Sequence, residues 1–110
     1  CIYYAVDCDP SQEEINAGIT DYFRAVGNVM NNLYQVGIYG SGASCAAMMN
    51  AGLAQRAWLS MSRDWAGYDS FHASGRWSLL QQEGSEMCGL SFDGDEISPI
   101  LGSGGFQLGV

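Results

Sequence analysis

The feature that most constrains the fold of this chain is a regular alternation of short apolar runs with segments that carry helix signals. Helices joined to strands in this order place consecutive strands in parallel, with right-handed crossovers. The alternation therefore predicts an α/β fold built from parallel βα repeats. The expected strands are residues 2–7, 34–40, 56–62 and 76–82, with a short fifth strand at 92–98.

The first helix has the clearest signals. Ser11 and Glu14 form a capping-box pattern, which marks a helix start. Apolar residues then recur at three- and four-residue steps to about Asn32, so one stripe of the helix faces a core. A second helix is expected after the turn at Gly40-Ser41-Gly42, and a short third one around 67–73.

Two architectures fit parallel βα repeats at this length. One is an open doubly wound sheet, and the other is a (β/α)8 barrel, which needs about 200 residues or more. With 110 residues the chain supplies only about half of a barrel. The chain also begins at Cys1 and enters a strand at once, so we expect a preceding segment. The pattern alone leaves both architectures open.

The charge balance narrows the range of partners. The chain has 12 acidic residues, four arginines and no lysine, for a net charge of −8. Phosphate backbones and anionic membranes are bound by Lys and Arg, so neither nucleic acid nor a membrane surface is expected as a partner. No apolar run approaches the roughly 20 residues that a membrane-spanning helix needs.

The cysteines and the single histidine give no metal signature. Cys1, Cys8, Cys45 and Cys88 form no CxxC pair, and His72 is distant from all of them in sequence. No metal or cofactor is therefore expected. We expect free thiols rather than disulfides, with Cys8 and Cys45 in the core, and a surface or capping role for His72.

Candidate catalytic residues follow the first strand. Ligands of parallel α/β folds bind at the carboxyl ends of the strands. The first strand is expected to end in Asp7-Cys8-Asp9, and because strand side chains alternate, the two aspartates should project to the same side, about 6.5–7 Å apart at Cα. A protonated acid beside a carboxylate is the equipment of glycoside hydrolysis. The alternative is structural, with Asp9 starting the Asp-Pro turn and Asp7 ending the strand.

Aromatic residues form a second candidate group. Large aromatic side chains with a polar edge can stack on sugars or pack as core. The candidates near the expected strand ends are Tyr39, Trp58, Trp65 and Trp77, with Gln81 on the same expected strand as Trp77.

Two further motifs are weaker. The segment GSGASC after the second strand lacks the last glycine of the dinucleotide-binding pattern, so a tight turn is the better interpretation. The acidic cluster Asp93, Asp95 and Glu96 lacks the DxDxDG order of a calcium loop, and a solvated turn is its alternative.

Several segments taken together carry a family resemblance. IYYAVDCDP, YFRAV, YQVGIYGSGASC, the stretch from MNAGL to GRWSLLQQ, and FDGDE occur in this order. The chain resembles a glycoside-hydrolase-like TIM-barrel family of unknown function that is related to the family 25 lysozymes. The resemblance implies that residues 1–110 are the C-terminal half of the barrel, about strands four to eight, with a Gly-rich tail at 99–110. The first strands would precede Cys1.

The resemblance also implies roles for individual residues. The lysozymes carry an Asp-x-Glu pair, which Asp7 and Asp9 match, with Asp7 as stabilising carboxylate and Asp9 as proton donor. Asp9 is one methylene shorter than the Glu of the lysozymes. A further lysozyme aspartate near the last strand matches Asp93 or Asp95. Strand alternation then places Gly37, Tyr39 and Ser41 in the barrel interior, Val36 and Ile38 toward the helices, and Trp77, Leu79 and Gln81 on one face.

Two functions follow from this resemblance. The first is a peptidoglycan hydrolase of the muramidase type, and the second is a non-catalytic barrel that binds cell-wall glycan. Either function implies a secreted or cell-envelope location. A half-barrel that dimerises to cover its edge strands is a third possibility.

Overall fold

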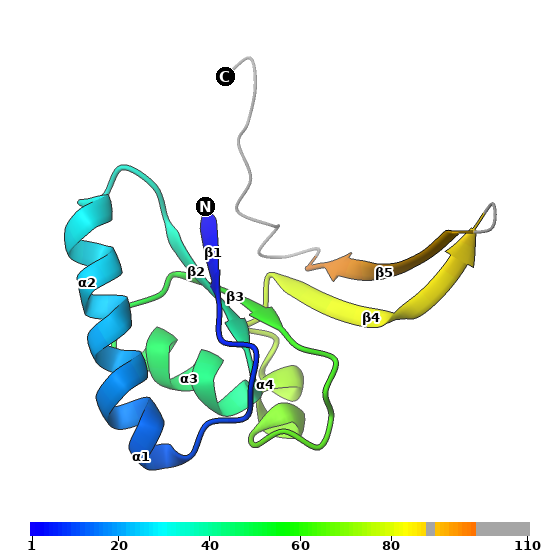
Figure 1. Ribbon diagram of the computed structural model, residues 1–110, viewed down its shortest axis with the longest axis horizontal. Helices are drawn as coiled ribbons and strands as arrows, with labels where there is room; N and C mark the ends of the chain where they lie inside the picture. Colours follow the sequence, from blue (N-terminus) through cyan, green and yellow to red (C-terminus); the bar gives the residue numbers. More distant parts are fainter. Residues whose placement is uncertain (88–89, 99–110) are drawn as a thin grey trace.

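The computed structural model describes residues 1–87 and 90–98, with only the main chain described over 83–87 and 90–94. These residues form one five-stranded sheet with helices (Figure 1). The strands are β1 (Ile2–Ala5), β2 (Val36–Gly40), β3 (Arg56–Leu59), β4 (Leu79–Met87) and β5 (Leu90–Ile97). The helices are α1 (Gln12–Glu14), η1 (Ile15–Ile19), α2 (Thr20–Met30), α3 (Gly42–Asn50) and α4 (Tyr68–Ser74). The expected tail at 99–110 lies outside the described residues.

The strands are arranged in chain order, β1-β2-β3-β4-β5. The first four pair in parallel, as the βα alternation predicts. The expectation that all repeats are parallel is wrong for the fifth strand, because β5 pairs antiparallel with β4. No helix separates β4 from β5, so the chain returns as a hairpin, which extends away from the helices in Figure 1.

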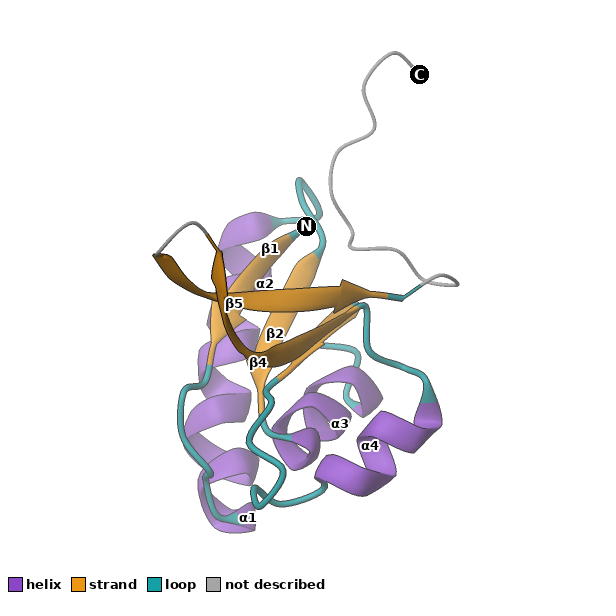
Figure 2. Cartoon of the chain, turned by 90° about the vertical axis from the view of Figure 1, so that its right-hand side faces the viewer, coloured by secondary structure: helices purple, strands orange, loops and turns teal. Residues whose placement is uncertain are grey.

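The two faces of the sheet differ. The helices lie together on one side of β1–β4 (Figure 2), as right-handed crossovers in a sequentially ordered sheet require. Ile38, Ala57 and Leu59 point to this side and are completely buried with Phe23 of α2. The opposite side, which we call the open face, carries the residues that alternate with them. Val36 and Ile38 thus face the helices, as expected.

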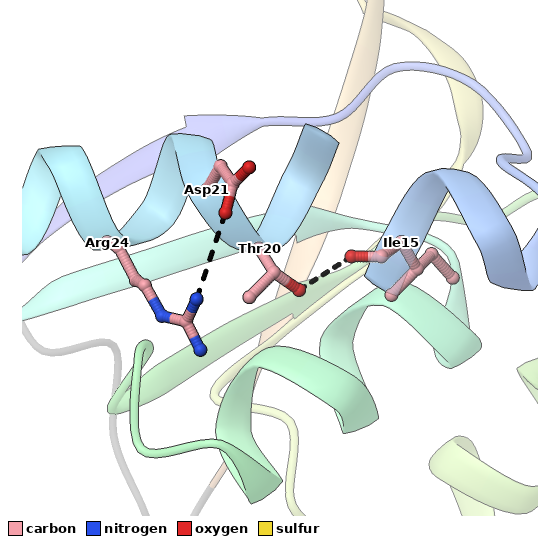
Figure 3. A network of polar contacts seen from close by, with 4 residues as sticks. All are labelled: Ile15, Thr20, Asp21 and Arg24. Atoms are coloured by element: carbon pink, nitrogen blue, oxygen red, sulfur yellow. Dashed lines mark hydrogen bonds and ion pairs between the residues drawn. The ribbon is translucent and has the colours of Figure 1, made fainter. Parts of the chain in front are cut away.

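The first helical segment is one continuous helix with a wide turn in its middle. Ser11 caps it as predicted: its hydroxyl accepts from the Glu14 amide at 3.2 Å, and the Glu14 carboxylate accepts from the Ser11 amide at 3.0 Å. At the π-helical turn η1, the Thr20 hydroxyl donates to the Ile15 carbonyl at 2.6 Å (Figure 3). The helix ends at Met30, where Asn31 adopts a left-handed conformation, instead of continuing to residue 32.

The glycine-rich turn before α3 packs tightly against another turn. A Cβ on Gly42 would lie 2.0 Å from the Gly67 carbonyl oxygen, so only glycine fits there. Ser41 is the N-cap of α3, and its buried hydroxyl accepts from the Ser44 amide at 3.1 Å. Ser41 therefore starts a helix and does not line the open face, which corrects the strand-alternation prediction. The interpretation of GSG as a tight turn is confirmed.

Three of the cysteines are described, and each is a free thiol. Cys45 is fully buried against β2, and burial raises its pKa to about 12. Cys8 is exposed, contrary to the expected core position, because β1 ends at Ala5 and the chain bends at Cys8. Cys88 lies outside the described residues. Among the described helices, none has the length and apolar character needed to cross a membrane.

Candidate functional site

The open face carries a cluster of aromatic rings from three parallel strands. The Trp58 ring on β3 lies edge-on to Tyr39 of β2, with centroids 4.8 Å apart, and to Tyr3 of β1, at 5.9 Å. The paired positions Tyr39 and Trp58 are neighbours in register, so their side chains project together. Gly37 makes room for the Tyr3 ring, because a Cβ there would lie 2.5 Å from a ring carbon.

Hydrogen bonds tie this aromatic cluster to β4 and β5. The Tyr39 hydroxyl donates to Gln81 Oε1 at 2.7 Å, and the same oxygen accepts from the Met61 amide at 3.3 Å. Trp58 Nε1 donates to Asp95 Oδ1 at 2.8 Å. We call Tyr39, Trp58, Gln81 and Asp95 the open-face cluster. All four are predicted site residues, and four different strands bring them together.

At the amino-terminal end of the open face, Arg56 joins neighbouring strands by hydrogen bonds. The Arg56 guanidinium donates to Ser78 Oγ at 3.4 Å and to Gln35 Oε1 at 3.2 Å. Burial raises the pKa of the nearby Tyr3 phenol, while Ser78 and Arg56 act in the opposite direction. Tyr3 is therefore a neutral, half-buried support for Trp58. The residues at this end of the sheet therefore support the aromatic cluster through the contact between Tyr3 and Trp58.

Asp7 and Asp9 have different neighbours in the structure. Asp9 Oδ1 accepts from the Ala66 amide at 3.1 Å, which ties the end of β1 to the loop between β3 and α4. Asp7 is exposed and lines a hollow with Ile19 and Tyr22, beside the first helix. The extended geometry that places both on one side does not apply, because the strand ends at Ala5. Sequence alternation therefore does not fix the relative direction of these carboxylates.

The remaining predicted residues lie outside the open-face cluster. Trp77 precedes β4, and its Nε1 donates to the His72 carbonyl at 3.1 Å. The Trp77 ring also stacks on the His72 imidazole, with ring centroids 6.1 Å apart. Because β4 begins at Leu79, strand alternation applies to Leu79 and Gln81 but not to Trp77, which was predicted to share their face. Trp65 is half-buried in the loop between β3 and α4. Asp93 lies opposite Gly84 in the β4–β5 pair, and its side chain is outside the described residues.

A cavity of about 880 Å³ lies between α4 and the β4–β5 hairpin. Among its lining residues, sequence reasoning named Gln81 as a candidate contact, Glu96 as part of an acidic cluster and His72 as a surface or capping residue. It did not name Arg63 or Asp69. Arg63, Asp69 and His72 lie close together in sequence, on the β3–α4 loop and α4, and the fold brings Glu96 of β5 to them. Among the side chains that the structure describes, those of residues 1–82 and 95–98, no three from His, Cys, Asp or Glu converge as a metal site requires.

Comparison with known proteins gives one match. Residues 1–88, which cover β1 to β4 and all the helices, match the family described as Rv2525c-like, glycoside hydrolase-like domain. No curated protein and no solved structure matches the chain significantly. The match covers most of the chain, including three members of the open-face cluster. The chain belongs to the family of Rv2525c-like, glycoside hydrolase-like domains.

Proposed function

We propose that this chain is part of a glycoside hydrolase that acts on peptidoglycan, with the open-face cluster as its glycan-binding surface. The observation that carries the proposal is the hydrogen-bonded set of Tyr39, Trp58, Gln81 and Asp95 in a glycoside-hydrolase-like domain. Aromatic rings with polar edges bind sugars by stacking and hydrogen bonding. Asp95 adds a carboxylate directly beside the largest of these rings.

The proposed chemistry uses acids at the carboxyl ends of the strands. Asp9 is the proton donor to the leaving oxygen, and Asp7 stabilises the positive charge that develops on the sugar ring. Asp95 is the third carboxylate, next to Trp58. The Asp9 oxygen that accepts from Ala66 is oriented by this bond, which leaves its other oxygen for the substrate. Asp93 is the alternative to Asp95 for the third carboxylate.

The proposed architecture is the C-terminal part of a (β/α)8 barrel. Four parallel strands in sequential order, with helices on one side, are what such a barrel contains. In the described chain β1 pairs only with β2, and two mostly apolar hollows lie beside its end, both lined by Ile19 and one of them also by Tyr22. A preceding βα unit would cover both. The reading frame upstream of Cys1 tests this, and three βα units in about 90 or more residues are expected.

A second candidate function is glycan binding without hydrolysis. It is favoured by the surroundings of the two aspartates, because Asp9 holds the loop at Ala66 while Asp7 lines a different hollow. In this alternative Asp9 is structural, and the open-face cluster binds glycan on its own. Both functions place the protein at the cell envelope.

The two functions are separated by measuring hydrolysis and binding on the same variants. Purified peptidoglycan is incubated with the natural protein and with Asp9→Asn and Asp95→Asn, and released reducing ends are counted. Asp21→Asn is the matched control, because Asp21 lies on the surface of α2 beside Arg24 at 3.8 Å. Sedimentation with the insoluble peptidoglycan reports binding.

The hydrolase proposal expects reducing ends from the natural protein and from Asp21→Asn, and a loss of about a hundredfold or more in Asp9→Asn. Equal release by Asp9→Asn would remove Asp9 as the proton donor. Sedimentation without any released ends would establish the binding function instead. Absence of both release and sedimentation would overturn both functions.

A further inference from the structure

The cavity between α4 and the β4–β5 hairpin is built like a binding site for a small polar ligand. Its volume of about 880 Å³ falls in the range of roughly 300–1,000 Å³ for ligand pockets. It lies beside the carboxyl end of β3, where Met61 and Arg63 begin the loop to α4. The other walls come from α4, β4 and β5. Ligands of parallel α/β folds bind at this end of the strands.

Several polar groups of the cavity have no partner within the described residues. The Arg63 guanidinium and the Asp69 carboxylate make no ion pair or hydrogen bond there. The ring nitrogens of His72 likewise make none, although the ring itself is fixed by stacking between Tyr68 and Trp77, with centroids at 5.6 and 6.1 Å. A fixed ring with free nitrogens beside free charged groups leaves donors and acceptors available to a ligand.

The signs of these groups limit the chemistry of the ligand. The lining holds one guanidinium, from Arg63, and two carboxylates, from Asp69 and Glu96, so the cavity has no excess of positive charge for an anion. Gln82 Nε2 donates to Glu96 Oε2 at 3.3 Å, which places an amide and a carboxylate side by side. A sugar hydroxyl both donates and accepts, so it can bond to carboxylates, amides and guanidinium alike. A ligand with several hydroxyls can therefore bond to each kind of polar group in this lining without needing a net negative charge.

We propose that this cavity binds a neutral saccharide unit. Gln81 lies at its boundary with the open-face cluster, since its Oε1 accepts from Tyr39 and Met61 and its side chain also lines the cavity. A glycan on the open face therefore continues past Gln81 into the cavity. The proposal deepens the proposed function by adding a second sugar position, and it rests on that function for the polymer that spans both.

His72 provides a direct test, because it is the only histidine in the chain. Its imidazole proton resonances are followed by NMR while the protein is titrated with chitotriose, cellotriose or trigalacturonate. The proposal expects a saturable shift of the His72 resonances with at least one of the two neutral trisaccharides and none with the anionic one. No shift with either neutral trisaccharide, or a shift with trigalacturonate alone, would overturn it.

Arg63→Gln and Arg24→Gln form a matched pair for the same titration. Arg63 lines the cavity, whereas Arg24 lies on the exposed surface of α2. Arg63→Gln is expected to weaken the apparent affinity about tenfold, as the loss of one charged hydrogen bond implies. Unchanged far-ultraviolet circular dichroism shows that each variant is folded, and equal affinity of the two variants would contradict the proposal. This titration measures only binding of free trisaccharides. A failure of the catalytic proposal is detected instead by the release of reducing ends from peptidoglycan, so the two failures can be told apart.

Discussion

Gly37→Ala should destabilise the protein by moving the ring that supports the open-face cluster. Gly37 is buried in the middle of β2, and the Tyr3 ring lies directly over it. An added Cβ would lie 2.5, 2.7 and 2.9 Å from three ring carbons of Tyr3, closer than carbon atoms approach. The ring must therefore shift, and its edge contact with Trp58 at 5.9 Å must change with it.

The size of the effect follows from two opposing contributions. Overpacking a well-filled site by one methyl group costs about 1–3 kcal/mol. Replacing glycine in a strand returns about 0.5–1 kcal/mol, because alanine loses less backbone entropy on folding. From the middle of each range, the expected net loss in the free energy of unfolding is about 1 kcal/mol. In a domain of this size each kcal/mol lowers Tm by roughly 4–8 °C.

Urea denaturation of Gly37→Ala beside Gly27→Ala measures this effect with a matched control. Gly27 is an exposed residue of α2, and nothing lies within 4 Å of its added Cβ. Gly27→Ala should therefore raise the stability by about 0.5–1 kcal/mol, through helix propensity alone. The near-ultraviolet circular dichroism of the aromatic residues should change only in Gly37→Ala. The reasoning is refuted if Gly37→Ala is as stable as the natural protein or more so.

Three further predictions concern caps and thiols. Ser41→Ala removes the N-cap of α3 and should cost about 1 kcal/mol in thermal denaturation; an unchanged Tm would show that the cap is replaced by another group. Burial raises the pKa of the Cys45 thiol to about 12, so Cys45 should resist iodoacetamide at pH 8 in the folded protein, while the exposed Cys8 reacts. Peptide mapping locates the label, and rapid labelling of Cys45 would contradict its burial. The hydrogen bond from the Ser11 amide lowers the pKa of the Glu14 carboxyl in the folded protein. The stability that this bond contributes is therefore present above the ordinary pKa of Glu, and it is lost as the pH falls through the lowered pKa of the folded state. Glu14→Gln should flatten stability against pH in that acidic range, and an unaltered pH profile would exclude Glu14 as a contributor.

The parts of the fold that depend on local signals were predictable from the sequence. The capping box at Ser11 and Glu14 specifies the first helix start through contacts only three residues apart. The alternation of apolar runs and helices predicted four parallel strands. The antiparallel direction of β5 could also have been predicted, although the expected run of parallel repeats missed it. No helix signal lies between the expected strands at 76–82 and 92–98, and a connection that short joins antiparallel strands.

In the candidate site, too, residues inside strands were predictable and residues beyond strand ends were not. Tyr39, Trp58 and Gln81 lie within strands, where alternation holds, and the structure brings them together with Asp95. Asp9 lies beyond the end of β1, where the bend at Cys8 breaks the alternation. The cavity lining could not be found from spacing, because its groups meet only through tertiary contacts between the β3–α4 loop, α4 and the hairpin.

The most direct test of the account measures glycan binding by matched tryptophan variants. Trp58→Phe keeps an aromatic ring but removes the N–H that donates to Asp95 at 2.8 Å. Trp65→Phe makes the same chemical change in the loop outside the open-face cluster. In sedimentation with purified peptidoglycan, Trp58→Phe should bind about tenfold more weakly and Trp65→Phe should bind like the natural protein. Unchanged binding by Trp58→Phe, or an equal loss in both variants, would contradict the assignment of the open face as the glycan-binding surface.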